Sequence, residues 1–105
     1  MPLPPPLSDE QRRQALEKAA EARRKRAELK EQLKSGRTSL KELLERSHDD
    51  IVGKMKVSTV LESLPGVGRV RARKIMERLD ISDSRRIRGL GQKQRENLLA
   101  EFARR

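Results

Sequence analysis

The chain of 105 residues is strongly basic and contains 33% hydrophobic, 40% charged and 1% aromatic residues. This length and apolar fraction allow one small domain with a limited core. A formal net charge of +10 predicts a polyanionic partner, either nucleic acid or an acidic membrane surface. The chain has no cysteine and one histidine, His48, which excludes disulfides, thiolate zinc sites and histidine metal clusters, so we expect no cofactor or metal.

The low aromatic content narrows the choice of nucleic acid. Proteins that hold single strands or RNA loops usually stack bases on several aromatic side chains, and this chain has only Phe102. Double-stranded DNA, which is bound through positive charge and backbone N–H groups, fits the composition better. No apolar run approaches the ~18 residues that span a bilayer, and the first residues lack the apolar segment of a signal peptide. We therefore expect an intracellular protein without a membrane partner.

The N-terminal third predicts a leader followed by one long helix. Four of the first seven residues are proline, which favours an extended, disordered leader. Ser8 and Gln11 form a capping box, and Gly36 is a stop signal, so a helix is expected from about residue 9 to residue 35. Its Ala-rich apolar stripe is thin, so the first half should bury little surface and fray.

A second capping box, Ser39 with Glu42, predicts a short helix that ends near Ser47, followed by a polar connection at residues 48–50. Beyond it, apolar residues recur at i, i+3, i+4 and i+7 on both sides of a glycine loop, which predicts two amphipathic helices. These residues are Val57, Val60, Leu61 and Leu64 before the loop, and Ala72, Ile75, Met76 and Leu79 after it.

A last helix is expected at about residues 92–103, where Leu98, Leu99 and Phe102 form its apolar face. No segment shows the period-two alternation of a half-buried strand, so the fold class is predicted to be all-α. The chain then divides into the leader (1–7), a long N-terminal helix (8–36) and a helical DNA-binding domain (37–105).

The stretch LPGVGRVRARKIM places two glycines directly before a basic helix. A helix N-terminus carries unpaired N–H groups and about half a positive charge, which together bind phosphate oxygens. Gly66 and Gly68 can adopt positive φ and let a phosphate approach the backbone, while Val67 is expected to pack inward. Nothing in this arrangement recognises a base, and an ordinary helix–helix turn is the alternative interpretation. The predicted DNA-binding loop comprises Leu64, Pro65, Gly66, Val67, Gly68, Arg69, Val70, Arg71 and Lys74.

The same residues carry a family resemblance. LPGVGRVRARKIMERLDI, followed by SRRIRGLG, resembles the helix-two-turn-helix module of a small-subunit ribosomal protein and of bacterial DNA glycosylases. From LPPPLSDEQRRQALEKAAEARRKRAELK through GKMKVSTVLESLPGVG to RRIRGLG, nearly the whole chain resembles the actinobacterial integration host factors. This resemblance implies a monomeric nucleoid-associated protein of the cytoplasm that binds double-stranded DNA with little sequence preference. It also implies DNA bending, chromosome organisation and assistance to phage integration, with an integrase–DNA complex as a further partner.

The resemblance further implies a second DNA-binding element, a lid over the duplex at about residues 82–94. In SRRIRGLGQKQ, Ile87 and Leu90 can hold the segment to the core while the arginines project outward. A solvated run of charge is the alternative, and Ser82 and Gln94 fit caps or surface positions equally well. The predicted lid residues are Ser82, Arg85, Arg86, Arg88, Gly89 and Gln94.

Basic and hydroxyl residues on two other segments form a second, weaker DNA surface in one interpretation and scattered solubilising groups in the other. These residues are Lys34, Arg37, Thr38, Ser39, Lys54 and Lys56. A monomer with two such faces could bridge duplexes. The basic run ARRKRAELK of the long helix is assigned a supporting electrostatic role.

Catalysis is not expected. The related glycosylases use an N-terminal proline amine and begin with the dipeptide PE, whereas here Leu3 follows Pro2. The chain also lacks the residues of a large catalytic domain. No Ser/His/Asp set or phosphate-loop lysine motif is present. A ribosome-associated RNA-binding protein is the alternative function, although the short tail after Phe102 lacks the long basic extension of the ribosomal relative.

Overall fold

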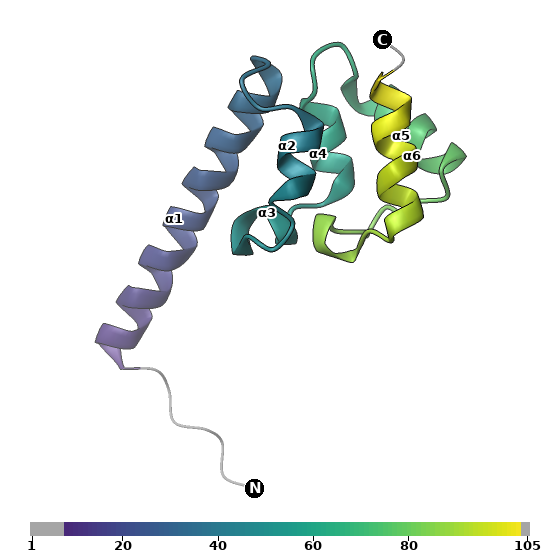
Figure 1. The fold of residues 1–105 in the computed structure, drawn as a ribbon. Helices are drawn as coiled ribbons and strands as arrows, with labels where there is room; N and C mark the ends of the chain where they lie inside the picture. The colour runs from purple at the N-terminus through teal and green to yellow at the C-terminus, as the bar shows by residue number, and fades with distance from the viewer. Residues whose placement is uncertain (1–7, 104–105) are drawn as a thin grey trace, which may run out of the picture.

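The structure, a computed structural model, describes residues 8–103, so the leader predicted for residues 1–7 lies outside the described part. Residues 8–103 contain no β-strand, and their β-type pairing is one isolated antiparallel bridge between Lys56 and Arg86. The predicted all-α fold is confirmed (Figure 1). The elements in chain order are α1 (Asp9–Lys34), α2 (Leu40–Glu45), α3 (Asp50–Lys54), α4 (Val57–Ser63), α5 (Gly68–Arg78), the 3₁₀ helix η1 (Ile87–Gly89) and α6 (Gln92–Ala103).

Helix α1 projects from the domain as a rod (Figure 1). The predicted capping box starts it, because the Ser8 backbone N–H donates to Gln11 Oε1 at 3.0 Å and the Gln11 N–H donates to Ser8 Oγ at 3.1 Å. Its buried residues are Leu29 and Leu33, both near the C-terminal end, whereas Leu16 is 64% exposed. The first half of α1 therefore buries little surface, as its thin apolar stripe predicts.

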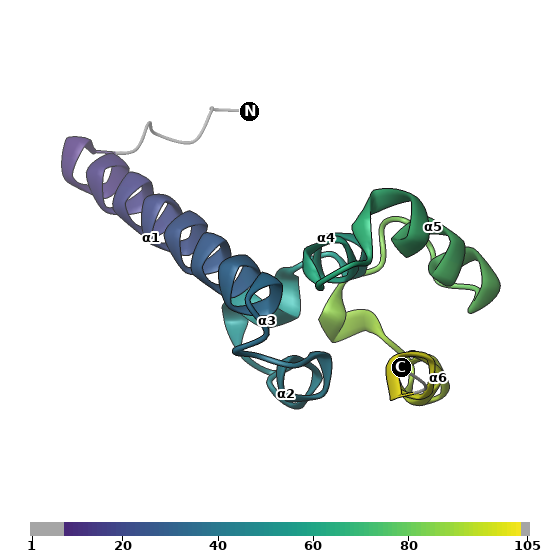
Figure 2. The ribbon, with the colours of Figure 1, turned by 90° about the horizontal axis from the view of Figure 1, so that it is seen from above.

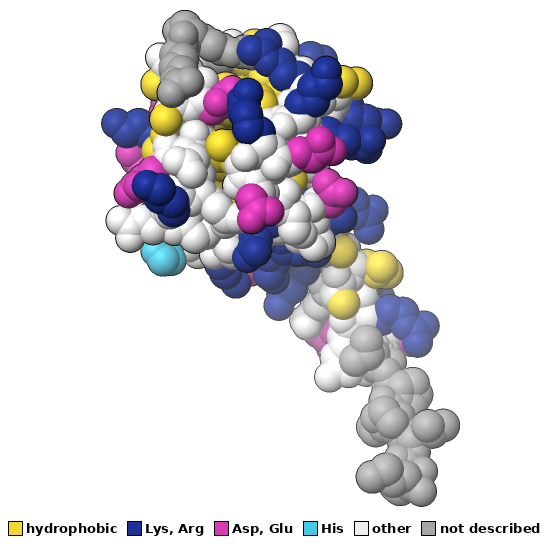
Figure 3. All heavy atoms as spheres, turned by 90° about the vertical axis from the view of Figure 1, so that its right-hand side faces the viewer, with side chains coloured by type: hydrophobic (Ala, Val, Ile, Leu, Met, Phe, Trp, Pro, Cys, Tyr) yellow, Lys and Arg dark blue, Asp and Glu magenta, His cyan; other side chains and the backbone are white. Residues whose placement is uncertain are grey.

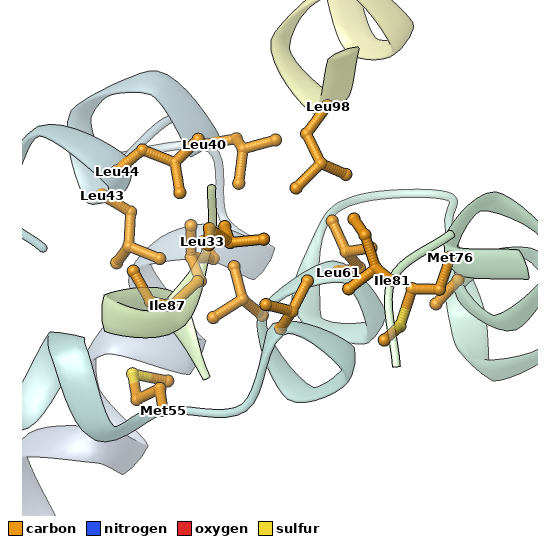
Figure 4. Close-up of a cluster of buried hydrophobic side chains, with 14 of the residues drawn as sticks. Leu33, Leu40, Leu43, Leu44, Met55, Leu61, Met76, Ile81, Ile87 and Leu98 are labelled. Carbon is orange, nitrogen blue, oxygen red and sulfur yellow. The ribbon is translucent and has the colours of Figure 1, made fainter. Parts of the chain in front are cut away.

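The core forms where α1, α2 and α6 meet the α3–α5 segment (Figure 4). Leu33 from α1, Leu43 from α2 and Leu98 from α6 have no exposed surface, and Leu61 and Ile87 complete the centre. Burial of a side chain of this size contributes about 1.5–3 kcal/mol. The end of α1 is thus part of the same core as the later helices.

Helices α4 and α5 pack extensively on each other on either side of the glycine loop, and α6 lies across the domain from them (Figure 2). The two amphipathic helices predicted around the loop are confirmed, and so is the last helix. The apolar face predicted for α6 consists of Leu98, which is fully buried, with Leu99 and Phe102 half-buried beside it.

Two details of the connection between α2 and α4 differ from the sequence prediction. Helix α2 ends at Glu45 rather than near Ser47, and the predicted polar connection at residues 48–50 is wrong at its end because α3 begins at Asp50. The Asp49 side chain starts this helix by accepting the N–H groups of Ile51 at 2.8 Å and Val52 at 3.1 Å. A five-residue helix is too short to show helical periodicity.

The segment that contains η1 is attached to the start of α4 by backbone hydrogen bonds. The Val57 N–H donates to the Arg85 carbonyl at 2.9 Å, and the Ile87 N–H donates to the Met55 carbonyl at 2.9 Å. Ile87 is fully buried and Leu90 is 7% exposed, so both anchor the segment as predicted. Within residues 8–103, no helix has the length and apolar character needed to cross a membrane, and no group of acidic or histidine side chains is arranged to hold a metal ion.

Candidate nucleic-acid interface

The loop between α4 and α5 has the backbone conformation that its glycines predict. Gly66 has a φ of 73° and Gly68 a φ of 69°, values that side chains with a Cβ disfavour. A Cβ built on either glycine would meet no atom within 4 Å. The two glycines therefore serve the turn of the backbone rather than close packing against the protein, and they leave open space above the loop.

Helix α5 begins at this open space. Val67 is the N-cap residue, and no side chain of the described residues caps the helix there. Val67 is 6% exposed, which confirms it as the inward anchor, and its N–H donates to the Leu64 carbonyl at 3.2 Å. The first turn contains no acidic residue. The positive end of the α5 dipole is thus left without a side-chain acceptor from residues 8–103.

Exposed cations surround this helix start. The Arg69 side chain is 82% exposed, and its Nε lies 4.0 Å from Glu62 Oε1, so the pair is weak. Arg71 and Lys74 are also exposed. Val70 is an exposed hydrophobic residue beside them, at 69%. Bare amide groups, a helix dipole and exposed guanidinium groups therefore lie on one patch, which is the chemistry of a phosphate site.

The lid arginines are exposed, but each also contacts the protein. Arg85 Nη1 donates to the Gly89 carbonyl at 2.9 Å, Arg86 Nη1 donates to the Lys54 carbonyl at 2.6 Å, and Arg88 Nη2 lies 3.5 Å from Asp50 Oδ1. These bonds hold the guanidinium groups along a hollow of about 430 Å³ instead of leaving them fully extended. Because these side chains are already held in place, they lose less conformational entropy when a phosphate binds.

Gly53 supports the lid and is not among the residues predicted to bind DNA. A Cβ on Gly53 would lie 2.6 Å from the Ser47 carbonyl oxygen and 3.0 Å from Arg88 Nε. Only a glycine permits this approach without a shift of the backbone. The available signal was a glycine within a helical segment, between Val52 and Lys54, where glycine is otherwise unfavourable.

Ser82 and Gln94 are engaged within the protein. The Gln94 side chain accepts the Gly91 N–H at 3.1 Å and donates to the Asp80 carbonyl at 3.0 Å, which ties the start of α6 to the end of α5. The Ser82 hydroxyl contacts the Ser84 hydroxyl at 2.9 Å. Local structure accounts for both side chains.

The structure divides the residues of the predicted second surface among three places. Lys34 lines a groove of about 870 Å³ together with the α4–α5 loop, whereas Lys54 and Lys56 line a hollow of about 380 Å³ beside Arg86. Thr38 donates to Gln32 Oε1 at 3.1 Å, and Ser39 caps α2 by accepting the Glu42 N–H at 3.1 Å. Arg37 is exposed in the turn between α1 and α2. The lysines therefore lie beside the loop and the lid.

Comparison with known proteins places this geometry in a family. Residues 33–102 match the family model of the S13-like H2TH domain. Over 99 residues, 93% of this chain, the sequence is 61% identical to Integration host factor of Streptomyces coelicolor, of which 92% is covered. It is 57% identical to Integration host factor of Mycobacterium tuberculosis over 93% of this chain and 94% of that protein. The chain belongs to the integration host factor family of S13-like H2TH proteins.

A solved structure of this family agrees with the fold. The structure of sIHF bound to an 8bp palindromic DNA superimposes with a TM-score of 0.80 and is 60% identical in sequence. The match covers 82% of this chain and 98% of the sIHF chain. The resemblance to actinobacterial integration host factors and the helix-two-turn-helix module are therefore confirmed. Since these relatives are named host factors, membership of the integration host factor family also supports the expectation that the chain is not an enzyme.

Proposed function

We propose that this chain binds double-stranded DNA through the phosphate backbone with little sequence specificity. The observation that carries the proposal is the uncapped start of α5, where Gly66 and Gly68 at positive φ expose backbone amides among exposed arginines. The DNA-bound state of the related sIHF supports the choice of DNA as the partner.

In the proposed mechanism, a phosphate oxygen accepts N–H groups from Gly68, Arg69 and Val70 at the positive end of the α5 dipole. Arg69 and Arg71 add charge-assisted hydrogen bonds to the neighbouring oxygens. A second contact is made by the lid, whose Arg85 and Arg86 are already aligned along its hollow. Phosphates are the same in every sequence, so these contacts fix the position of the protein without selecting bases.

Contacts by both the loop and the lid suit a protein that bends or constrains DNA. A rigid protein that grips phosphates at two places stabilises the DNA curvature that brings both places into contact. We assign the chain to the nucleoid as a monomer that organises the chromosome and assists phage integration, with an integrase–DNA complex as partner. Lys34, Lys54 and Lys56 extend the two contact regions and provide the route to a bridged second duplex.

Gel-shift titrations at increasing salt test the function. For ~5–8 neutralised phosphates, log K should fall against log salt with a slope of about −5 to −7. A scrambled duplex should bind equally well, and matched duplex RNA should compete poorly. Displacement of the DNA by equal amounts of RNA would support the ribosome-associated alternative, and a slope near zero would exclude phosphate binding.

The double variant Arg85→Ala/Arg86→Ala tests the lid. We expect weaker binding to all duplexes alike and a salt slope flatter by about two, because each lost phosphate contact removes about one unit. Arg12→Ala/Arg13→Ala carries the same charge change on the projecting half of α1 and serves as the matched control. A slope equal to that of the control would remove the two lid arginines from the interface.

A further inference from the structure

Two serine hydroxyls share the hollow of the lid, of about 430 Å³, with basic side chains. The basic and hydroxyl residues that line it are Lys54, Arg85, Arg86, Arg88, Ser82 and Ser84. Among residues 8–103, no carboxylate lines this hollow, and Asp83 lines a different one beside Arg69. Figure 3 shows Lys and Arg side chains gathered on the underside of the helical domain, the side on which Figure 1 shows α3 and the lid segment. A phosphate attached to either serine would therefore lie among cations.

Ser84 is the more accessible of the two hydroxyls. It is exposed and lies in an irregular turn between Ile81 and Ile87, which are buried and hold the segment at both ends. The Ser82 hydroxyl accepts the Ser84 N–H at 3.2 Å, so it is used within the turn. An enzyme can therefore reach Ser84 without opening a helix or removing this turn contact.

Other serines of the described part have different surroundings. The hydroxyls of Ser8 and Ser39 cap α1 and α2 by accepting backbone N–H groups. Ser58 is half-buried in α4 and lines a hollow together with the carboxylates of Glu62 and Asp83. Ser84 thus combines exposure, irregular backbone and a setting of cations.

The lid arginines have N–H groups available for a phosphate. A guanidinium group has five N–H donors, and Arg85 and Arg86 each donate to one backbone carbonyl. Arg88 Nη2 lies 3.5 Å from Asp50 Oδ1, but the Asp50 side chain is 78% exposed, so this contact is weak. A phosphate carries about −1.5 to −2 charge at pH 7, and opposite an arginine cluster it forms about one to three charge-assisted hydrogen bonds. A phosphate on Ser84 would thus occupy the place that the lid offers to a DNA phosphate.

We propose that Ser84 is a phosphorylation site that turns off DNA binding by the lid. A protein kinase transfers the γ-phosphoryl group of a nucleoside triphosphate to Ser84 Oγ. The new bond joins Oγ to the γ-phosphorus, and the bond from that phosphorus to the β–γ bridging oxygen breaks. The nucleoside diphosphate leaves, and the hydroxyl proton passes to a base of the kinase.

The attached phosphate pairs with Arg85, Arg86 and Arg88 and excludes the DNA phosphate from the hollow. Because it is tethered to the same segment, it competes with DNA at a high local concentration. The inference rests on the proposed DNA-binding function. It deepens that function by naming how the contact of the lid is regulated.

The test compares two full-length proteins, each with phosphoserine incorporated at one position during translation. One carries it at position 84, and the control carries it at position 8. Ser8 begins the projecting end of α1 and precedes the buried Leu29 by ~30 Å of helix at 1.5 Å per residue. This separation exceeds the Debye length of about 10 Å at 0.1 M salt. Both positions are exposed, so both proteins should fold, and circular dichroism checks this.

Gel shift with a 12-bp duplex across a salt series measures the effect. Phosphoserine at position 84 should weaken binding at least about tenfold and flatten the salt slope by about two to three units, because each of three lost contacts contributes about 0.9. The control should bind within about threefold of the unmodified protein. Equal losses would show a general charge effect and overturn the proposal, as would unchanged binding by the position-84 protein. If the unmodified protein shows no salt-dependent binding, the proposed function fails, which separates the two conclusions.

A second readout requires no DNA. ³¹P NMR follows the second ionisation of the phosphate at position 84, and its pKa should be lower in the folded protein than in urea, because guanidinium groups favour the dianion. In the Arg85→Gln/Arg86→Gln/Arg88→Gln background, the two pKa values should agree more closely. Equal values in the protein that retains the arginines would show that the phosphate does not enter the hollow.

Peptide mass spectrometry tests whether the modification occurs in cells. Protein purified across growth phases from the cells that make it should carry phosphate on Ser84. A Ser84 that stays unmodified in every growth phase would overturn the regulatory role.

Discussion

The starts of α1 and α5 differ in whether side chains of the protein balance their unpaired N–H groups and positive dipole ends. At α1, the Ser8 side chain accepts the Gln11 N–H, and Asp9 and Glu10 place negative charge in the first turn. At α5, Val67 provides no side-chain acceptor, and the first turn carries Arg69. One helix start is therefore satisfied by its own residues, and the other is left positive.

The uncapped start of α5 lowers the stability of this helix relative to a capped one. A side-chain cap contributes about 0.5–2 kcal/mol, and acidic residues in the first turn add about 0.3–1 kcal/mol. Helix α5 has neither, and it needs one glycine at positive φ before it and another as its first residue. A helix start without these stabilising groups, placed on a basic surface, is expected where an external anion supplies the missing interaction.

The largest expected effect comes from giving α5 a negative charge at its start. Gly68→Glu should lower affinity for a duplex at least about 100-fold, since a carboxylate would occupy the phosphate position and repel the DNA. The positive φ of Gly68 adds a folding cost of about 1–2 kcal/mol. Gel shift measures the affinity, and urea denaturation measures the free energy of unfolding.

Gly36→Glu is the matched control for this change. Gly36 has a φ of 80°, and a Cβ there also meets no atom within 4 Å, so the strain and the charge change are comparable. We expect a similar loss of stability with affinity within about threefold of wild type. Full binding by the Gly68 variant would contradict the role of the α5 start.

A smaller change makes the start of α5 resemble that of α1. Arg69→Glu introduces an acidic first turn, which should raise the free energy of unfolding by at most about 0.3–1 kcal/mol through the helix dipole, less the repulsion from Glu62, whose Oε1 lies 4.0 Å from Arg69 Nε. The same variant should bind DNA roughly tenfold more weakly, because one phosphate contact is lost and one repulsion is added. Stability and binding must move in opposite directions, and a variant that improves both would refute the comparison.

Removal of the internal caps should affect stability and leave binding unchanged. Ser39→Ala removes the acceptor for the Glu42 N–H at the start of the core-packed α2, and we expect a loss of about 1 kcal/mol. Ser8→Ala removes the same kind of bond from the exposed end of α1, where it should increase local fraying with little effect on global unfolding. Amide hydrogen exchange distinguishes the two outcomes, and an equal global loss in both variants would contradict them.

The smallest effect is expected from pH. The Val52 N–H, followed by that of Ile51 and the charge of Arg46, lowers the pKa of Asp49 below its ordinary 3.8, although partial burial opposes the shift. The stability from this cap is therefore fully present above pH ~3.8 and is lost as the pH falls through the folded-state pKa. Urea midpoints should show a small acid-side decrease that Asp49→Asn reduces, and an unchanged decrease would exclude Asp49 as its source.

The sequence predicted the elements whose signals are local. Two capping boxes located α1 and α2, helical spacing located α4, α5 and α6, and the PGVG pattern predicted positive φ at both glycines. The inward direction of Val67 and Ile87 was also predicted, since burial of an apolar residue in a basic segment is favourable, although Val70 in the same basic segment is 69% exposed.

Features that depend on distant contacts could not be predicted. Helix α3 is one turn long and depends on the Asp49 cap, so periodicity gives no signal for it. The close approach of Arg88 to Gly53 joins residues 35 positions apart, and the bond from Arg86 to the Lys54 carbonyl joins residues 32 apart. The hollow lined by Lys54, Lys56 and Arg86 likewise exists only after the chain folds.

Backbone amide shifts give the most direct test of the central claim that the open start of α5 binds phosphate. ¹⁵N-labelled protein titrated with a short duplex should show its largest shifts at the N–H groups of Gly66, Gly68, Arg69 and Val70. The N–H groups at the start of α1, at Asp9 and Glu10, should hardly move. Saturated binding with unmoved glycine amides, and large shifts elsewhere, would contradict the account.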